Sequence, residues 1–150
     1  MNKSATSASL NDLIEVLNDG VKFYDDAAMT TKNSHYKGLF QRMADGKRRI
    51  ASALKSQVTL HGDKPADSGT VAGALRQTYT DLAAKWSDHP ETKFIAQLEQ
   101  SEDRILHAFE DALSESKQPE VREIAQSFLP DLRRMHDEMR DLKHQLKPAA

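Results

Sequence analysis

The chain has 150 residues, of which 21 are basic and 23 are acidic, so its formal net charge is −2. This length suits one domain, and the near balance of charges argues against a dedicated nucleic-acid binder, which usually carries a basic face. The chain has no cysteine, which excludes disulfide bonds, thiolate metal sites and a cysteine nucleophile.

The sequence also offers no sign of a membrane segment. No apolar run approaches the roughly 18 residues of a transmembrane helix, and the first ten residues lack the apolar stretch of a signal peptide. We therefore expect a cytoplasmic protein with neither a membrane nor a nucleic-acid partner.

The first half of the chain predicts a tail and two long helices. Residues 1–8 are small, polar and aperiodic, as in a flexible N-terminal tail. Ser9 and Asp12 resemble a capping box at a helix start, a polar break at residues 30–34 separates the helices, and the second ends near Gly62. Their apolar positions recur in steps of three and four: Leu10, Leu13, Ile14, Leu17, Val21, Tyr24 and Ala28, then Leu39, Met43, Ile50, Leu54 and Val58.

The second half predicts a short helix and two more long ones. Ser68 could cap the short helix, which ends near Trp86, and Pro90 and Pro119 begin the long ones. We place the bundle domain at residues 9–146 and a C-terminal tail at 147–150. The inward positions of the long helices are Ile95, Leu98, Glu102, Ile105, Phe109 and Ala112, then Ala125, Phe128, Leu132, Met135, Met139, Leu142 and Leu146.

These elements predict an all-α fold, because no segment alternates with the period of a strand. Short links join the first helix to the second and the third to the fourth, so two αα-hairpins are joined by a long crossover that carries the short extra helix. This is the ferritin-like form of a four-helix bundle. Residues 24–27, YDDA, match residues 109–112, FEDA, which indicates that the two hairpins are repeated halves.

Such bundles often hold two metal ions, using one Glu from each of two helices and a Glu-x-x-His pair from each of the others. No Glu-x-x-His occurs in this chain; Asp141 and His144 have the spacing but lie in the final turns. The sequence therefore predicts no metal, no cofactor and no catalytic residue at the usual dinuclear centre.

Glu102 is the unusual inward residue, because a buried carboxylate costs several kcal/mol unless it is paired or coordinated. It could reach solvent at the rim of the stripe, bind a metal ion, or pair with Lys47, whose place on the second helix is also inward. The last alternative predicts a partly buried ion pair between Lys47 and Glu102 in the core. The metal alternative would use Glu99, Glu102 and His136 to hold iron or manganese.

A second apolar line on the first two helices lies away from the core stripe. It includes Val16, Phe23 and Phe40. These residues could cradle the crossover helix or form a self-association face, and both alternatives stay open.

Five runs carry a resemblance to a known family: LNDLIEVLNDGVKFYDDAA, FQRMADGKRRIASAL, SGTVAGALRQTY, LEQSEDRILHAFEDAL and MHDEMRDL. Together they resemble a bacterial four-helix-bundle family of the ferritin-like group that is catalogued as a domain of unknown function. The resemblance implies the fold and no established activity.

Ligand positions of the wider ferritin-like group, including rubrerythrin-type proteins, can be placed on this chain through the same resemblance. Glu102 and His136 match ligands in type, whereas Leu17, Lys47, Ile50 and Arg133 occupy the other four positions. The resemblance therefore implies that the dinuclear centre is incomplete.

Three functional hypotheses follow. The first is a non-catalytic bundle with a structural or partner-binding role that self-associates. The second is a divergent metal-carboxylate protein of the diiron type that uses Glu102 and His136. The third is a small-molecule carrier with an apolar cavity between the helices.

Overall fold

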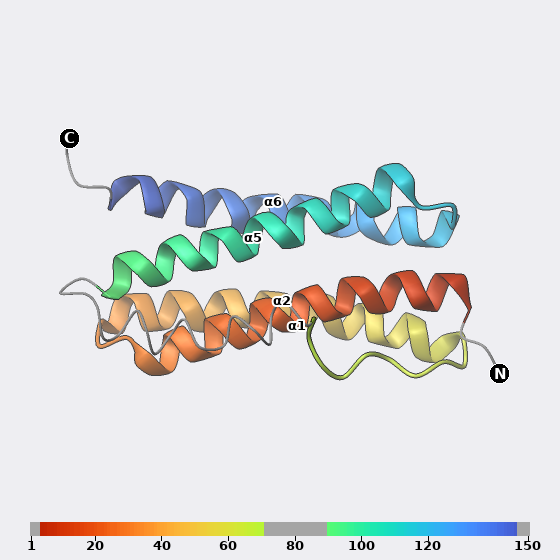
Figure 1. Ribbon diagram of the computed structural model, residues 1–150, viewed down its shortest axis with the longest axis horizontal. Coiled ribbons are helices and arrows are strands. Elements are labelled where there is room, and N and C mark those ends of the chain that lie inside the picture. Colours follow the sequence, from red (N-terminus) through yellow and green to blue (C-terminus); the bar gives the residue numbers. More distant parts are fainter. Residues whose placement is uncertain (1–3, 71–89, 147–150) are drawn as a thin grey trace.

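The computed structural model describes residues 4–70 and 90–146, and all regular secondary structure in these ranges is helical. Four long helices run along the molecule (Figure 1): α1 (Ala5–Thr30), α2 (Ser34–Leu60), α5 (Pro90–Glu115) and α6 (Pro119–Gln145). The predicted all-helical fold with four long helices is confirmed.

The helices form two antiparallel pairs that pack on each other. α1 lies against α2, α5 lies against α6, and α1 also contacts α5. α2 and α5 run in the same direction (Figure 1), so the chain has to return along the bundle between them.

The helix ends follow local signals in the sequence. Asn33 caps α2 by accepting a hydrogen bond from the Tyr36 N–H at 3.1 Å. α2 ends at Leu60, and Gly62 follows with a φ of 76°, a conformation that other residues rarely adopt. Pro119 occupies the first turn of α6, where a missing N–H is tolerated.

The start of α1 differs from the prediction. Its cap is Ser4, whose hydroxyl accepts from the Ser7 N–H at 3.0 Å, and the helix begins at Ala5. The predicted start at Ser9 is therefore wrong. The small residues between Ser4 and Ser9 continue the helix because they are compatible with it and an earlier cap is available.

The predicted stripes form the core. All of their residues are buried except for Val21, Ala112, Phe128, Leu142 and Leu146, which are half-buried. The two charged residues that the stripes place inward, Lys47 and Glu102, are buried with them.

Residues 61–70 turn back along the bundle from the end of α2 (Figure 1). Polar side chains of α1 hold this segment. Asn11 makes two hydrogen bonds to the backbone of the segment, at 3.2 and 2.7 Å. Asp19, two turns later, accepts from the Thr70 N–H at 3.0 Å. The segment after α2 is therefore directed back along the first helix.

A short helix was predicted between Ser68 and Trp86. Apart from residues 68–70, this stretch lies outside the described residues. Among the helices that the structure does describe, none combines the length and apolar character needed to cross a bilayer.

Candidate functional site

The centre of the bundle contains a charged cluster to which each helix contributes one residue: Tyr24 from α1, Lys47 from α2, Glu102 from α5 and Met135 from α6. The Lys47 ammonium contacts Glu102 Oε1, and the Tyr24 hydroxyl donates to the same oxygen at 2.6 Å. The side chains of Lys47 and Glu102 are 0% and 1% exposed. We call these four residues the charged core.

The Lys47 ammonium also lies close to a sulfur atom and an aromatic ring. Its Nζ lies 3.7 Å from Met135 Sδ and 4.7 Å from the centroid of the Tyr24 ring. The negative face of an aromatic ring attracts a cation, most strongly where water is excluded. The ammonium is therefore stabilised by the ring in addition to the carboxylate.

Gly20 makes room for this arrangement. A Cβ atom at this position would lie 2.8 Å from Ile105 Cδ1 and 3.1 Å from Lys47 Cδ. The absence of a side chain on α1 thus lets the aliphatic part of Lys47 cross the core to reach Glu102.

The structure brings together Lys47 and Glu102, the pair that the helix spacing suggested, and buries both completely rather than in part. The alternative in which Glu102 reaches solvent is wrong. Its second oxygen, Oε2, is buried and has no hydrogen-bond partner among the described residues. The carboxylate therefore depends on Oε1 for its stabilisation.

The sequence analysis did not predict that Tyr24 donates a hydrogen bond to Glu102. A signal was present, because Tyr24 occupies the position that Phe109 holds in the other half of the internal repeat. A tyrosine hydroxyl in a core position needs a polar partner, and Glu102 is that partner.

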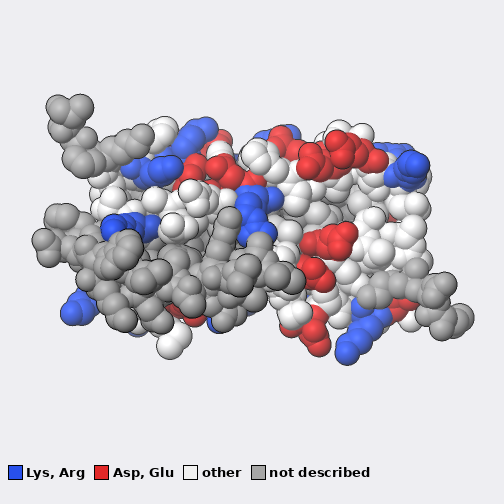
Figure 2. All heavy atoms as spheres, in the orientation of Figure 1, with Lys and Arg blue, Asp and Glu red and all other residues white. Residues whose placement is uncertain are grey.

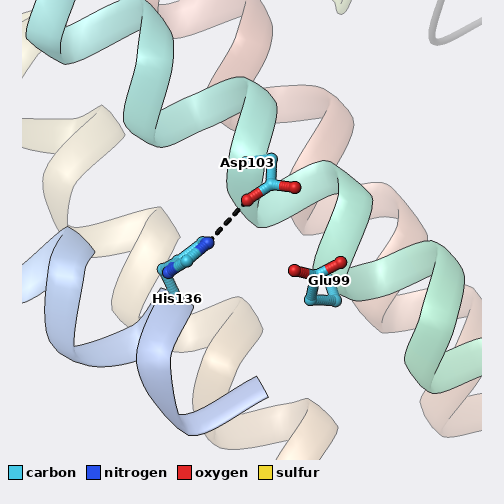
Figure 3. A group of neighbouring side chains, drawn as sticks. All are labelled: Glu99, Asp103 and His136. Atoms are coloured by element: carbon cyan, nitrogen blue, oxygen red, sulfur yellow. Dashed lines mark hydrogen bonds and ion pairs between the residues drawn. The ribbon is translucent and has the colours of Figure 1, made fainter. Parts of the chain in front are cut away.

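A second polar cluster lies on the seam between α5 and α6, and Figure 3 shows its side chains. It contains Glu99 and Asp103, one helical turn apart on α5, and His136 on α6, and we call it the seam cluster. His136 Nε2 is 2.5 Å from Asp103 Oδ1, and its Nδ1 is 3.1 Å from Asp137 Oδ1. Lys143 Nζ donates to Glu99 Oε2 at 3.3 Å.

The environment of His136 favours the charged imidazolium. Burial alone would lower its pKa, but the hydrogen bonds to Asp137 and Asp103, together with their negative charges, outweigh burial and raise the pKa above its ordinary value. The hydrogen bond with His136 in turn lowers the pKa of Asp137.

The seam cluster corrects the composition of the predicted metal site, Glu99, Glu102 and His136. Glu99 and His136 come together, but Asp103 joins them in place of Glu102, which faces Lys47. On a helix, residues four apart share a face, so Glu99 and Asp103 both point towards α6. The sequence analysis did not select Asp103 as a candidate ligand.

The predicted association face is also changed by the structure. Phe23 and Phe40 are 3% and 0% exposed, so neither lies on an open surface. Phe40 packs between Tyr24 and Tyr36, with ring centroids 6.2 Å from each. Contacts with aromatic side chains of the same chain therefore explain why Phe40 is apolar. Of Val16, Phe23 and Phe40, only Val16 is half-exposed.

Val16 lines a surface groove of about 520 Å³ between α1 and α5. Apolar side chains from α1, α5 and the start of α6 share its lining with acidic residues. Elsewhere, acidic and basic side chains are interspersed over the face shown in Figure 2, where the described residues form no continuous basic stripe.

The charged core generates a prediction about stability. Lys47→Met should lower the free energy of unfolding by about 3–5 kcal/mol, because it leaves the Glu102 carboxylate buried without a counter-charge. The double variant Lys47→Met/Glu102→Gln removes both charges and should recover most of this loss. Urea denaturation measures both variants, with Lys37→Met, an exposed lysine of α2, as the control. A single variant as stable as this control would contradict the prediction.

The seam cluster generates a prediction about pH. Because folding raises the pKa of His136, its contribution to stability should be complete below the unfolded value of about 6.5 and lost as the pH rises through the folded value. An NMR titration of the imidazole in chelator-treated protein should give a pKa above 6.5, and Asp103→Asn should lower it. Asp103 and Asp137 contact the ring and Glu99 lies in the same cluster, whereas Lys143 contacts Glu99 and Arg140 contacts Asp137. If the pKa of His136 is unchanged in Asp103→Asn, the hydrogen bond between His136 and Asp103 does not raise that pKa.

Comparison with known proteins identifies the chain at the level of a family. The sequence model described as "Domain of unknown function (DUF2383)" matches residues 5–115. The match covers α1, α2 and α5, including Tyr24, Lys47 and Glu102, whereas α6 with Met135 and His136 follows it. Among curated proteins, none matches this chain. Because the matched region spans well over half of its length, the chain belongs to the DUF2383 family, whose domain has no known function.

Proposed function

We propose that this protein is a non-catalytic, ferritin-like four-helix bundle that self-associates and has a structural or partner-binding role. Two antiparallel helix pairs support the ferritin-like arrangement, since the parallel directions of α2 and α5 require a long crossover between the pairs. We also propose that this crossover carries the short extra helix predicted from the sequence. A cytoplasmic location and the absence of a nucleic-acid partner stay predictions from the sequence.

The observation that carries the proposal is the contact between the Lys47 ammonium and Glu102. Glu102 is the inward carboxylate that a dinuclear centre would use, and a lysine already provides its cation. A second cation about 4 Å from Nζ would be repelled by roughly 4 kcal/mol per unit charge at an effective dielectric constant of 20. The charged core therefore opposes metal binding at the same place.

Burial supports a non-catalytic role for these residues. A general acid, base or nucleophile has to come within hydrogen-bond reach of its substrate. Tyr24, Lys47 and Glu102 are each at most 1% exposed, with α1, α2, α5 and α6 packed around them. The charged core is better suited to holding the four helices in one alignment.

The proposal predicts that Glu102 does not control metal content. The untagged protein, grown with added iron and manganese and purified without chelator, should carry the same metal content when Glu102 is replaced by Gln. Inductively coupled plasma mass spectrometry measures this, with Glu115→Gln, an exposed carboxylate of α5, as the control. Two metal equivalents per chain that disappear only in Glu102→Gln would overturn the proposal in favour of a diiron-type protein.

The proposal also predicts an oligomer in solution, with Val16 at or near the contact, since this residue lines the groove between α1 and α5. Sedimentation velocity should show assemblies larger than one chain, and Val16→Glu should shift them towards the monomer. Lys37→Glu places a negative charge on an exposed site of α2 and should leave the distribution unchanged. A wild-type chain that sediments as a monomer at high micromolar concentration would refute self-association.

A further inference from the structure

The seam cluster has the composition and geometry of a small metal site. Glu99, Asp103 and His136 each offer one ligand atom, and these atoms all lie within 4.8 Å of one another. Figure 3 shows the two carboxylates on consecutive turns of α5 and the imidazole of α6 facing them. The cluster is distinct from the charged core, because Glu102 and Lys47 are not members of it.

We propose that the seam cluster binds one divalent transition-metal ion, with Zn²⁺ as the best match. Zinc accepts imidazole nitrogen and carboxylate oxygen, and three protein ligands with a water in the fourth position make a common zinc site. The inference goes beyond the proposed function and does not depend on it.

The orientation of His136 points to a ligand. Its Nδ1 is 3.1 Å from Asp137 Oδ1, which fixes the ring and directs Nε2 towards Glu99 and Asp103. A carboxylate that holds the distal nitrogen of a ligating histidine is a regular feature of metal sites, because it fixes the tautomer and makes the other nitrogen a better donor. Asp137 would supply that support here.

The burial of Glu99 gives a second reason. This residue is 8% exposed, and a carboxylate removed from water needs a cation nearby. Lys143 contacts Oε2 at 3.3 Å, which leaves Oε1 for a metal ion. Unlike the buried Lys47, the Lys143 side chain is 33% exposed, so solvent screens its charge and it can turn away from a metal ion.

Binding requires small local adjustments, because the three ligand atoms lie within 4.8 Å of one another and have to reach the closer, even spacing around one ion. Ligand atoms around a tetrahedral zinc ion lie about 3.3 Å apart, whereas His136 Nε2 and Asp103 Oδ1 are 2.5 Å apart in this structure. The ion would replace this hydrogen bond, and the two groups would separate by less than about 1 Å. The Asp103 side chain is 43% exposed, so it has room to move and solvent can deliver the ion.

The test is isothermal titration calorimetry of the untagged, chelator-treated full chain with zinc chloride at pH 8, where protons compete less for the imidazole. We expect one Zn²⁺ per chain, with binding weakened at least tenfold in His136→Gln and in Glu99→Gln. His35→Gln, an exposed histidine at the start of α2, should bind like the wild type. Circular dichroism checks the folding of each variant, and Asp103→Asn, at a half-exposed site, replaces any variant that does not fold.

Three results would overturn the proposal. The first is no zinc binding by the wild type, and the second is unchanged binding in folded variants of the cluster. The third is loss of binding in His107→Gln with retention in His136→Gln, which would place the metal on Asp103 and the exposed His107, one turn apart on α5. Two equivalents of zinc lost through Glu102→Gln would instead contradict the proposed function, so the two failures are distinguishable.

Discussion

The rest of the bundle depends on the neutralisation of one buried positive charge. An ammonium inside a protein costs several kcal/mol unless a carboxylate and further polar contacts compensate for it. Lys47 obtains this compensation from Glu102 Oε1 on α5, and the Tyr24 hydroxyl on α1 donates a hydrogen bond to the same oxygen. Sliding any of these helices by one turn would separate the partners, so the charged core favours a single axial alignment of the four helices in a way that apolar contacts alone do not.

α5 organises both polar clusters because its residues face two directions. Glu102 turns into the bundle, whereas Glu99 and Asp103, which flank it, turn towards α6. A shift of one residue on a helix rotates the side chain by about 100°, which is enough to move a carboxylate from the interior to the seam. One acidic stretch therefore supplies a neutralised pair in the core and an acidic site at its edge.

The sequence analysis reached the parts of the structure that depend on helical periodicity. The stripes identified the core of all four helices, and the inward places of Lys47 and Glu102 led to their pairing. It failed where the result depends on which neighbouring helix a side chain meets. Asp103 was not selected as a ligand although it contacts His136 across the seam. Phe40 was placed away from the core stripe although it packs between Tyr24 and Tyr36. A one-dimensional pattern gives the direction of a side chain around its own axis but not the rotation of the adjacent helix.

The position of the pair in the chain has a consequence for folding. Lys47 belongs to the first helix pair and Glu102 to the second, so α1 and α2 alone enclose an ammonium with the Tyr24 ring beside it but no Glu102 carboxylate. A hairpin formed early must keep its interior open to water around Lys47 until α5 docks. Closure of the core is thereby coupled to the meeting of the two halves, and such coupling favours cooperative folding of the whole bundle over independent folding of either half.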